Sequence, residues 1–291
     1  MANGQRIGLV LEGGAMRGMY TAGVLDYFAE RDLYFPYVIG VSAGACMASS
    51  YLSRQIGRNR RVNLEFAGDP RYLSWRKFVR HRQELFGMDF IFHEIPRNLI
   101  PFDFRAFHES PEEFVIVTTD LETGQPVYYR KSEGLTDDDL LTLLKASSSL
   151  PIFAPVVEYR GRKLMDGGIA DPIPIRQAEA DGCSRTVLIL TRNQGYVKKK
   201  TRLGWLVRRK FAAYPDFVNV VLTRHHHYND TTRYIEEREQ AGAAFAIRPR
   251  APMRTSRTEQ NRTKLEQLYR QGYSDAEYYY PKLMEWIGQM G

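Results

Sequence analysis

The first 54 residues alternate two short apolar runs with two helical patterns, and this alternation limits the fold more strongly than any other feature of the chain. Ile7–Leu11 and Tyr37–Gly40 have the composition of buried strands, while Arg17–Glu30 and Ala43–Arg54 have the periodicity of helices. Strands that are joined by single helices lie parallel in one sheet, and the helices cover its faces. The sequence therefore predicts a three-layer α/β/α fold with a mostly parallel central sheet.

The same two patterns return further along the chain. Glu113–Thr119 and Thr186–Thr191 are strand candidates, and the second is nearly all apolar, as a central parallel strand is. Thr136 is a candidate N-cap for a helix whose first turn, Asp137–Asp139, places negative charge at the positive end of the helix dipole. The last third adds two helical patterns and a strand candidate: Asp216–Ala241, Thr263–Trp286 with a break at Gly272, and Ala243–Ile247.

Composition limits the environment and the partners of the chain. The 291 residues include 41 Lys and Arg against 34 Asp and Glu, a formal net charge of +7, which favours an anionic partner. Cys46 and Cys183 lie in apolar contexts and are too few for a disulfide scaffold, so we expect a reducing, cytoplasmic location. No stretch approaches the roughly 18 apolar residues of a membrane span, and Glu12 interrupts the first apolar run, which is unlike a signal peptide. Any membrane contact is therefore expected to be peripheral.

A G-x-S-x-G motif lies directly between the second strand and the second helix. It consists of Gly40, Val41, Ser42, Ala43 and Gly44. The flanking glycines allow a sharp turn from strand to helix and leave the Ser42 hydroxyl exposed at its apex, the geometry of a nucleophile elbow. The alternative interpretation is a turn of small residues without chemistry.

A glycine-rich loop joins the first strand to the first helix. Its backbone N–H groups can form a concave site for an anion, either a phosphate or the oxyanion of a tetrahedral intermediate. No Gly-Lys-Ser/Thr follows, as a Walker loop requires, and two adjacent glycines do not fit G-x-G-x-x-G, which weakens a dinucleotide site. Arg17 either adds positive charge at this site or is an exposed first-turn arginine. The loop consists of Gly13, Gly14, Ala15, Met16, Arg17 and Gly18.

A third motif, Asp166-Gly167-Gly168, follows a short basic stretch. The two glycines let the backbone pass close to another element and leave the carboxylate free to point into a site. The alternative interpretation is an ordinary Asp-Gly turn.

These three motifs, in this order, resemble the patatin-like phospholipase family. Its pattern is a glycine-rich oxyanion loop after the first strand, G-x-S-x-G soon afterwards, and a much later D-G-G or D-G-A. Two further blocks are similar to the family: Thr119-Asp120-Leu121 with Thr123-Gly124, and Ala146 to Pro151 with Phe153-Ala154-Pro155. A C-terminal block is similar to the helical tail of bacterial members: Lys264-Leu265 with Leu268-Tyr269 and Gly272-Tyr273.

The resemblance implies a serine acyl-ester hydrolase of the phospholipase A or lysophospholipase type that works through an acyl-enzyme. Ser42 would be the nucleophile, Asp166 the group that takes its proton, and the backbone amides from Gly13 to Arg17 the oxyanion hole. Such a Ser-Asp dyad needs no histidine, metal or cofactor. A lipid or other acyl ester would be the substrate. A non-catalytic module of the same fold that binds an anion or lipid is a rival hypothesis.

Histidine provides the second rival, a Ser-His-Asp esterase. His225-His226-His227 lies downstream of the serine, as the chain order of such triads requires. The triplet lies within a helical pattern, where adjacent side chains point in different directions and a solvated face is the favoured interpretation. It also lacks the spacing of metal ligands. His81, His93 and His108 precede the expected triad order and have no assigned role.

The motifs must meet at one site, which favours one domain over the whole chain. We expect a catalytic core over residues 5–191, an Arg- and aromatic-rich insertion over 57–108 that packs over one edge of the sheet, and a basic segment with C-terminal helices over 192–291. The basic runs at 58–61 and 198–210 are either surfaces for an anionic membrane or solvated loops. Nucleic-acid binding is the least favoured, since no recognised motif accompanies the charge. The sequence leaves the oligomeric state open.

Overall fold

A computed structural model describes residues 6–81 and 84–289 of the chain. Its centre is an eight-stranded sheet in which five strands run parallel, and this confirms the predicted fold class. The order is β5-β6-β3-β2-β1-β7-β8, and β4 also pairs with β3; β4, β5 and β6 run antiparallel to their neighbours. The strands are β1 (Arg6–Leu11), β2 (Tyr37–Val41), β3 (Glu113–Asp120), β4 (Pro126–Arg130), β5 (Val157–Tyr159), β6 (Arg162–Asp166), β7 (Cys183–Ile189) and β8 (Ala244–Ile247).

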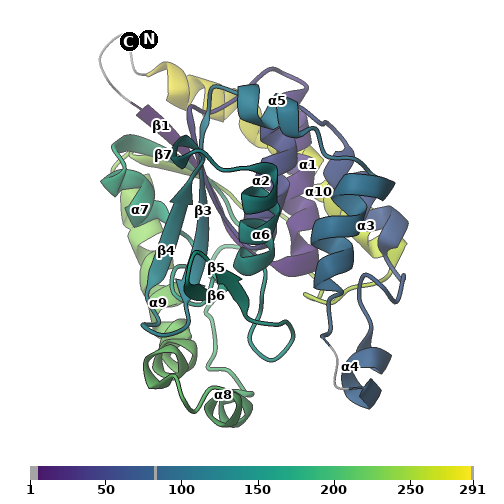
Figure 1. Cartoon of the computed structure of the whole chain (residues 1–291). Helices are drawn as coiled ribbons and strands as arrows, with labels where there is room; N and C mark the ends of the chain where they lie inside the picture. The colour runs from purple at the N-terminus through teal and green to yellow at the C-terminus, as the bar shows by residue number, and fades with distance from the viewer. Residues whose placement is uncertain (1–5, 82–83, 290–291) are drawn as a thin grey trace.

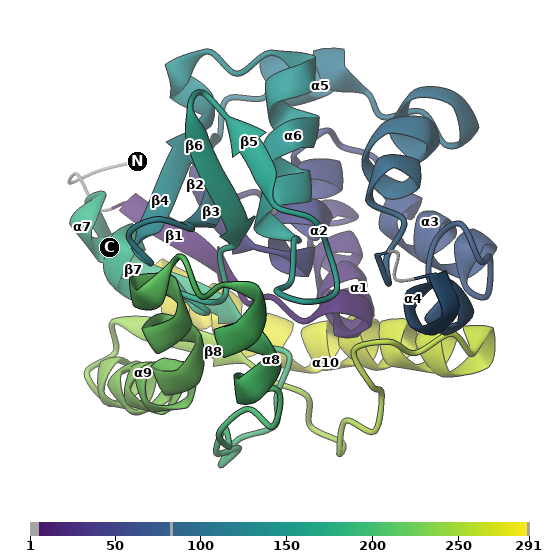
Figure 2. The ribbon, with the colours of Figure 1, turned by 60° about the horizontal axis from the view of Figure 1, so that its bottom comes forward.

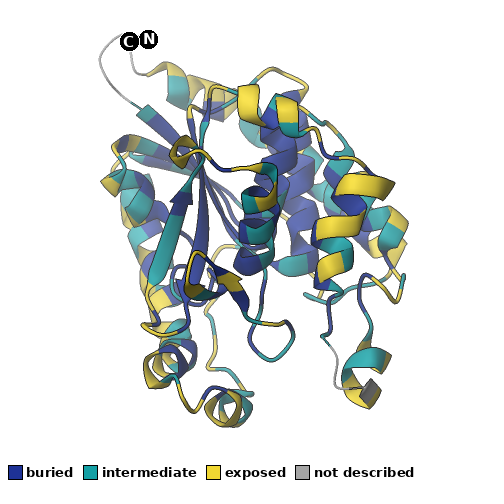
Figure 3. Ribbon diagram, in the orientation of Figure 1, coloured by how far each residue is buried: buried dark blue, intermediate teal, exposed yellow. Residues whose placement is uncertain are grey.

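Helices cover both faces of this sheet (Figure 1). Side chains of β1 alternate between the two faces: Leu9 and Leu11 belong to one apolar core, and Val10 belongs to the other. The sheet and the inner helices are accordingly buried (Figure 3). One face carries α1 (Gly18–Ala29), α2 (Ala43–Leu52), α6 (Asp137–Ser147) and α10 (Arg262–Gly288), and the other carries α7 (Ile175–Ala180) and α9 (Pro215–Gln240).

The predicted break at Gly272 is wrong, because α10 continues through this residue. A Cβ atom at Gly272 would lie 2.0 Å from the carbonyl oxygen of Tyr20 in α1, and one at Gly23 would lie 2.1 Å from the carbonyl oxygen of Tyr269. The glycine therefore permits a close crossing of α1 and α10, which lie side by side in Figures 1 and 2. A small residue in a helical pattern signals either a break or a close contact, and local sequence does not distinguish them.

The segment 57–108 does not pack over an edge of the sheet as predicted. It lies outside the helical layer, where α3 contacts α1, α2 and α10, α5 contacts α2, and the π-helix η2 contacts α6. Its apolar side chains thus extend the core on that face. The segment consists of α3 (Arg58–Phe66), α4 (Trp75–His81), η2 (Phe90–Leu99) and α5 (Phe104–Glu109).

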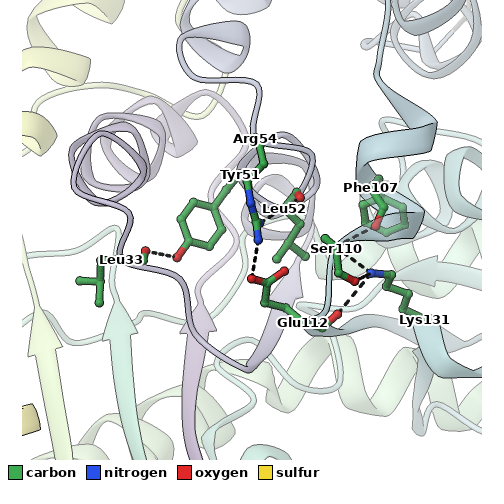
Figure 4. Close-up of polar contacts among 8 residues, drawn as sticks. All are labelled: Leu33, Tyr51, Leu52, Arg54, Phe107, Ser110, Glu112 and Lys131. Carbon is green, nitrogen blue, oxygen red and sulfur yellow. Dashed lines mark hydrogen bonds and ion pairs between the residues drawn. The ribbon is translucent and has the colours of Figure 1, made fainter.

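Polar contacts fix the C-terminal end of α2, the end opposite Ser42 (Figure 4). The Arg54 guanidinium donates to a carboxylate oxygen of buried Glu112 over 2.6 Å, and the Tyr51 hydroxyl donates to the carbonyl of Leu33. The Lys131 ammonium donates to the Ser110 hydroxyl over 2.7 Å. The Arg54 contact links the end of α2 to the residue before β3, and the Tyr51 contact links the helix to the segment before β2.

Candidate active site

Ser42 lies at the sharp turn between β2 and α2. Its backbone has φ 53° and ψ −125°, a conformation that costs a non-glycine residue about 1–3 kcal/mol. A Cβ atom at Gly40 would lie 2.7 Å from the backbone of Ala45, and one at Gly44 would lie 2.6 Å from the carbonyl oxygen of Leu11. Both glycines are therefore required by close backbone contact, and the turn has the geometry of a nucleophile elbow.

Asp166 reaches the same site from the last residue of β6. This short antiparallel strand pairs with β3, and the Thr119 hydroxyl donates to the Asp166 carbonyl over 2.8 Å. A Cβ atom at Gly167 would lie 2.1 Å from the carbonyl oxygen of Val117, so only glycine fits beside β3. The Asp-Gly-Gly motif is thus a close packing of two strands that directs the carboxylate toward Ser42.

The Asp166 carboxylate is buried, and it lines the same small cavity as Ser42. Burial raises the pKa of this carboxyl, and the nearby Arg224 charge opposes the rise. The neighbouring Ser42 side chain and the Gly168 N–H, which donates to the carboxylate over 2.7 Å, lower the pKa as well, but less than burial raises it. A buried carboxylate with a raised pKa is a better proton acceptor than a solvated one.

The glycine-rich loop lies against the elbow. A Cβ atom at Gly13 would be 3.1 Å from Cβ of Ser42, and one at Gly14 would be 3.0 Å from the Thr191 hydroxyl. Within residues 6–81 and 84–289, the N–H groups of Gly13, Gly14 and Ala15 have no hydrogen-bond acceptor. They are the N–H groups that remain available to an oxyanion.

The other predicted oxyanion-loop amides are already engaged. Met16 N–H donates to the Arg257 carbonyl over 3.3 Å, and Arg17 N–H donates to the Gly14 carbonyl over 3.2 Å. Gly18 N–H donates to the carbonyls of the two residues that begin the preceding turn. Of the six residues predicted for the oxyanion loop, Gly13, Gly14 and Ala15 are therefore the ones whose N–H groups have no acceptor among the described residues.

Ser147, at the end of α6, is a residue of the site to which the motifs assigned no role. Its hydroxyl accepts from the Ser42 N–H over 2.8 Å and donates to the Val117 carbonyl over 2.6 Å. The side chain is fully buried. Because it satisfies the backbone of the strained turn, Ser147 links the elbow to β3.

An apolar cavity of about 130 Å³ opens beside Ser42. It lies between α2, α6 and the segment 57–108, and its wall includes Met47, Phe86, Ile95 and Leu144. Polar groups in the wall bond to one another, since the Tyr72 hydroxyl donates to the Asn63 carboxamide oxygen, and the Asn63 amide donates to the Asn59 carbonyl. The interior is thus suited to a hydrocarbon chain.

Comparison with known proteins decides the family. Residues 9–179, more than half of the chain, match the family described as patatin-like phospholipase. The chain belongs to the patatin-like phospholipase family. This membership confirms the resemblance seen in the motifs, and the family is one of lipid ester hydrolases, as the motifs predicted. Residues 214–288, which include all of α9 and α10, match a domain of unknown function.

Relatives of this family member differ greatly in length. The uncharacterized protein YjjU of Escherichia coli is 28% identical over 257 residues, which cover 85% of this chain and 70% of that protein. Lysophospholipase NTE1 of Candida glabrata is 26% identical over 198 residues, 62% of this chain but only 10% of that protein. The structure of VipD from Legionella pneumophila covers 94% of this chain and 66% of that chain, with a TM-score of 0.47 and 12% identity.

The histidine triplet lies away from the patatin-like motifs. His225, His226 and His227 belong to α9, and the last two are exposed, as the solvated-face interpretation predicted. Within the described ranges, neither cavity that borders Ser42 has a histidine in its wall. The described part of the chain also contains no cluster of His, Cys, Asp or Glu that could hold a metal ion.

Proposed function

We propose that this chain hydrolyses a fatty-acyl ester of a lipid, as a phospholipase A or lysophospholipase does, with Ser42 as nucleophile and Asp166 as its base. The observation that carries the proposal is the position of Ser42, which shares one cavity wall with buried Asp166 and also borders an apolar cavity. The word lysophospholipase in the name of the NTE1 relatives supports the substrate class.

The reaction proceeds in two halves. Ser42 Oγ attacks the ester carbonyl carbon while its proton passes to Asp166, and the oxyanion accepts hydrogen bonds from the loop amides of Gly13, Gly14 and Ala15. Collapse breaks the bond to the alcohol, which takes the proton from Asp166 as it leaves. Water then attacks the acyl-enzyme, gives a proton to Asp166, and releases the fatty acid, after which Ser42 recovers its proton.

The apolar cavity is the proposed site of the acyl chain. Each buried methylene contributes about 0.8 kcal/mol of transfer free energy, so a long chain has a strong preference for this space over water. The segment 57–108 supplies much of the wall, and chain-length preference would therefore be set by this segment rather than by the motifs.

We also propose a peripheral contact with an anionic membrane. α8 (Gly204–Lys210) carries exposed Trp205 beside three basic residues, and α4 carries exposed Trp75 and Val79. Both helices project from the same end of the molecule (Figures 1 and 2). Apolar side chains among basic ones are typical of interfacial binding, and each basic residue near an anionic surface contributes about 1 kcal/mol.

The other basic run is a poor candidate for this contact. Arg58 donates to the Ile100 carbonyl over 2.9 Å, and Arg60 forms a bidentate pair with Glu266. These guanidinium groups are engaged in contacts within the chain.

No helix within residues 6–81 and 84–289 combines the length and the apolar character that a membrane span needs. The cytoplasmic location stays a prediction.

We propose that the whole chain acts as one unit with its core over residues 5–191. The long contact between α1 and α10, with Gly23 and Gly272 at the crossing, supports this proposal. Met16 N–H also bonds to a carbonyl of the C-terminal region, so that region contacts the glycine-rich loop directly.

The proposal is tested by labelling with a fluorophosphonate probe and mapping the adduct by mass spectrometry. We expect one adduct on Ser42, and loss of lysophospholipid hydrolysis in both Ser42→Ala and Asp166→Asn. Joint replacement of the three triplet histidines by alanine abolishes turnover only if a Ser-His-Asp triad operates. Ligand binding without any acyl-enzyme would instead support the non-catalytic module.

A further inference from the structure

A second cavity borders Ser42 on the side away from the apolar one, and basic side chains dominate its wall. It lies between the glycine-rich loop, Asp166 and the segment that follows β7. We call its basic residues the cationic cluster: Arg17, Arg192, Lys198, Arg224 and Arg257. Only Arg17 falls within the stretch that matches the patatin-like family, so the cluster is mostly supplied by the C-terminal part of this chain.

The cationic cluster has no matching negative charge. Asp166 and Glu12 are the acidic residues in the cavity wall, and both oxygens of Glu12 are already engaged, by the Thr191 N–H at 2.6 Å and the Tyr228 hydroxyl at 2.9 Å. Among the residues that the structure describes, no carboxylate oxygen lies within 4.0 Å of a nitrogen of the cluster. Five basic side chains therefore meet beside the nucleophile without an ion pair.

Arg17 provides an independent indication of an anion site. Its side chain is only 2% exposed, and its Nη1 atom is buried with no hydrogen-bond partner among the described residues. Its Nε atom reaches only the Gly14 carbonyl, at 3.4 Å. A buried guanidinium nitrogen without an acceptor is costly, and an anion in the cavity would supply that acceptor.

Burial and the neighbouring positive charges lower the pKa values of basic groups in the cluster. Burial and the neighbouring Arg257 charge lower the pKa of Arg17 to about 10. Burial and the charges of Arg224 and Arg257 lower the pKa of Lys198 to about 6. The backbone of Lys198 is nevertheless held in place, since its N–H donates to the Asn229 carboxamide oxygen over 2.8 Å. With this pKa Lys198 is mostly neutral near pH 7, so the positive charge of the cluster there comes from its four arginines.

We propose that the cationic cluster binds the phosphate group of the substrate, so that the enzyme prefers acyl esters that carry a phosphate monoester to uncharged acyl esters and to zwitterionic phosphodiesters. The proposal rests on the proposed function, because an ester carbonyl at Ser42 with its acyl chain in the apolar cavity directs the alcohol part toward the cluster. Phosphate oxygens accept from several arginines at once. Arg17, Arg224 and Arg257 all lie in the cavity wall, and the Arg224 Nε atom donates to the Gly168 carbonyl, which holds this side chain beside Asp166.

The cavity as it stands measures about 20 Å³, room for a water molecule, and must widen for a phosphate. Arg192, Lys198 and Arg257 lie on connecting segments rather than in helices or strands, and all three are half-buried. Their long side chains can therefore move outward, while Arg17 and Arg224 are held by their backbone elements.

The first experiment compares kcat/KM for lysophosphatidic acid, lysophosphatidylcholine and monoacylglycerol with the same acyl chain. We expect lysophosphatidic acid to be preferred over monoacylglycerol by tenfold or more. In Arg257→Gln this preference falls about 10- to 100-fold, the effect of losing one hydrogen bond to a charged group. Arg257→Lys retains part of it, and Arg105→Gln, which removes an exposed charge of α5 outside both cavities, leaves the preference unchanged.

The second experiment measures binding without turnover. Glycerol 3-phosphate, glycerol and inorganic phosphate are titrated calorimetrically into Ser42→Ala. We expect glycerol 3-phosphate to bind, glycerol not to bind, and Arg257→Gln to weaken the binding of glycerol 3-phosphate. Tighter binding of inorganic phosphate, without competition against lysophosphatidic acid, would identify a free-anion site and overturn the proposal.

The two experiments separate this inference from the proposed function. An active hydrolase with equal kcat/KM for the three lipids, and no binding of glycerol 3-phosphate, overturns the phosphate site and leaves the hydrolase. Binding of glycerol 3-phosphate that depends on Arg257, in a protein with no hydrolytic activity, overturns the proposed function and leaves the phosphate site.

Discussion

Replacing Ser147 by alanine tests whether the strained turn at Ser42 depends on its buried hydrogen bond. The Ser147 hydroxyl bridges the Ser42 N–H and the Val117 carbonyl at 2.8 and 2.6 Å, and the side chain is fully buried. Alanine leaves the Ser42 N–H without an acceptor. A buried donor in that state costs about 1–3 kcal/mol, so the free energy of unfolding should fall by that amount.

The effect on activity should exceed the effect on stability. The turn is already strained at φ 53°, and loss of the bond that fixes it lets the Ser42 hydroxyl move relative to Asp166 and the loop amides. We expect kcat to fall by about 100-fold, since a displacement near 1 Å at a reacting group has this effect. Urea unfolding followed by circular dichroism, and hydrolysis of a chromogenic acyl ester, measure the two quantities.

Ser149→Ala is the matched control. Ser149 is also fully buried, but its hydroxyl donates to the Lys145 carbonyl within the same turn of chain and has no contact with the elbow. We expect a loss of about 0.5–1.5 kcal/mol and nearly normal kcat. Equal kcat in Ser147→Ala and wild type, or an equal fall of kcat in both variants, would refute the role given to Ser147.

Three further predictions concern other parts of the molecule. Gly272→Ala should lower the free energy of unfolding by about 1–3 kcal/mol, because the added Cβ atom overlaps the backbone of α1. Gly288→Ala, where a Cβ atom would meet nothing within 4 Å, should not lower it. Equal thermal stability of the two variants would contradict the close crossing. Burial raises the pKa of Asp166, and only its carboxylate form can act as the base. The acidic limb of the pH profile of kcat/KM should therefore lie above about pH 4. A limb at or below this value would contradict the role of Asp166 as the base. Burial raises the pKa of the Cys46 thiol to about 11, so iodoacetamide should alkylate it slowly at pH 8, and rapid alkylation measured by mass spectrometry would show that the cavity wall is open to water.

Local patterns predict the central part of the fold well. The strands and helices around Ser42 carry a strong signal, because a parallel strand buried on both faces is apolar at nearly every position, as most of β1 and the second half of β7 are. Ser42 and Asp166 are also found from short motifs, since the close contacts at Gly40, Gly44 and Gly167 leave no choice of residue there.

Other features depend on contacts between distant segments, which one sequence does not reveal. β6 is a short antiparallel strand with polar residues, so its pattern is weak although it carries Asp166. Ser147 is one of three adjacent serines, and only the fold distinguishes it from the others. A glycine at position 272 indicates a break, and its contact with Tyr20, which lies far away in the sequence, is not visible in the local pattern.

The cationic cluster illustrates the same limit for charge. The net charge of +7 predicts an anionic partner, and the basic runs at 58–61 and 198–210 are the only local patterns of positive charge that suggest where it binds. Among the described residues, Lys198 is the one member of those runs in the wall of the basic cavity, and isolated arginines from four other segments complete the cluster. Single basic residues spread over the chain give no local pattern.

The most direct test of the account is a rapid-quench measurement of the acyl-enzyme. Wild-type protein is mixed with a chromogenic fatty-acyl ester, quenched in acid within milliseconds, digested, and analysed by mass spectrometry. The account predicts a peptide that contains Ser42 and carries the mass of the acyl group, and no such peptide in Asp166→Asn. Turnover with no adduct, or with an adduct on another residue, would contradict it.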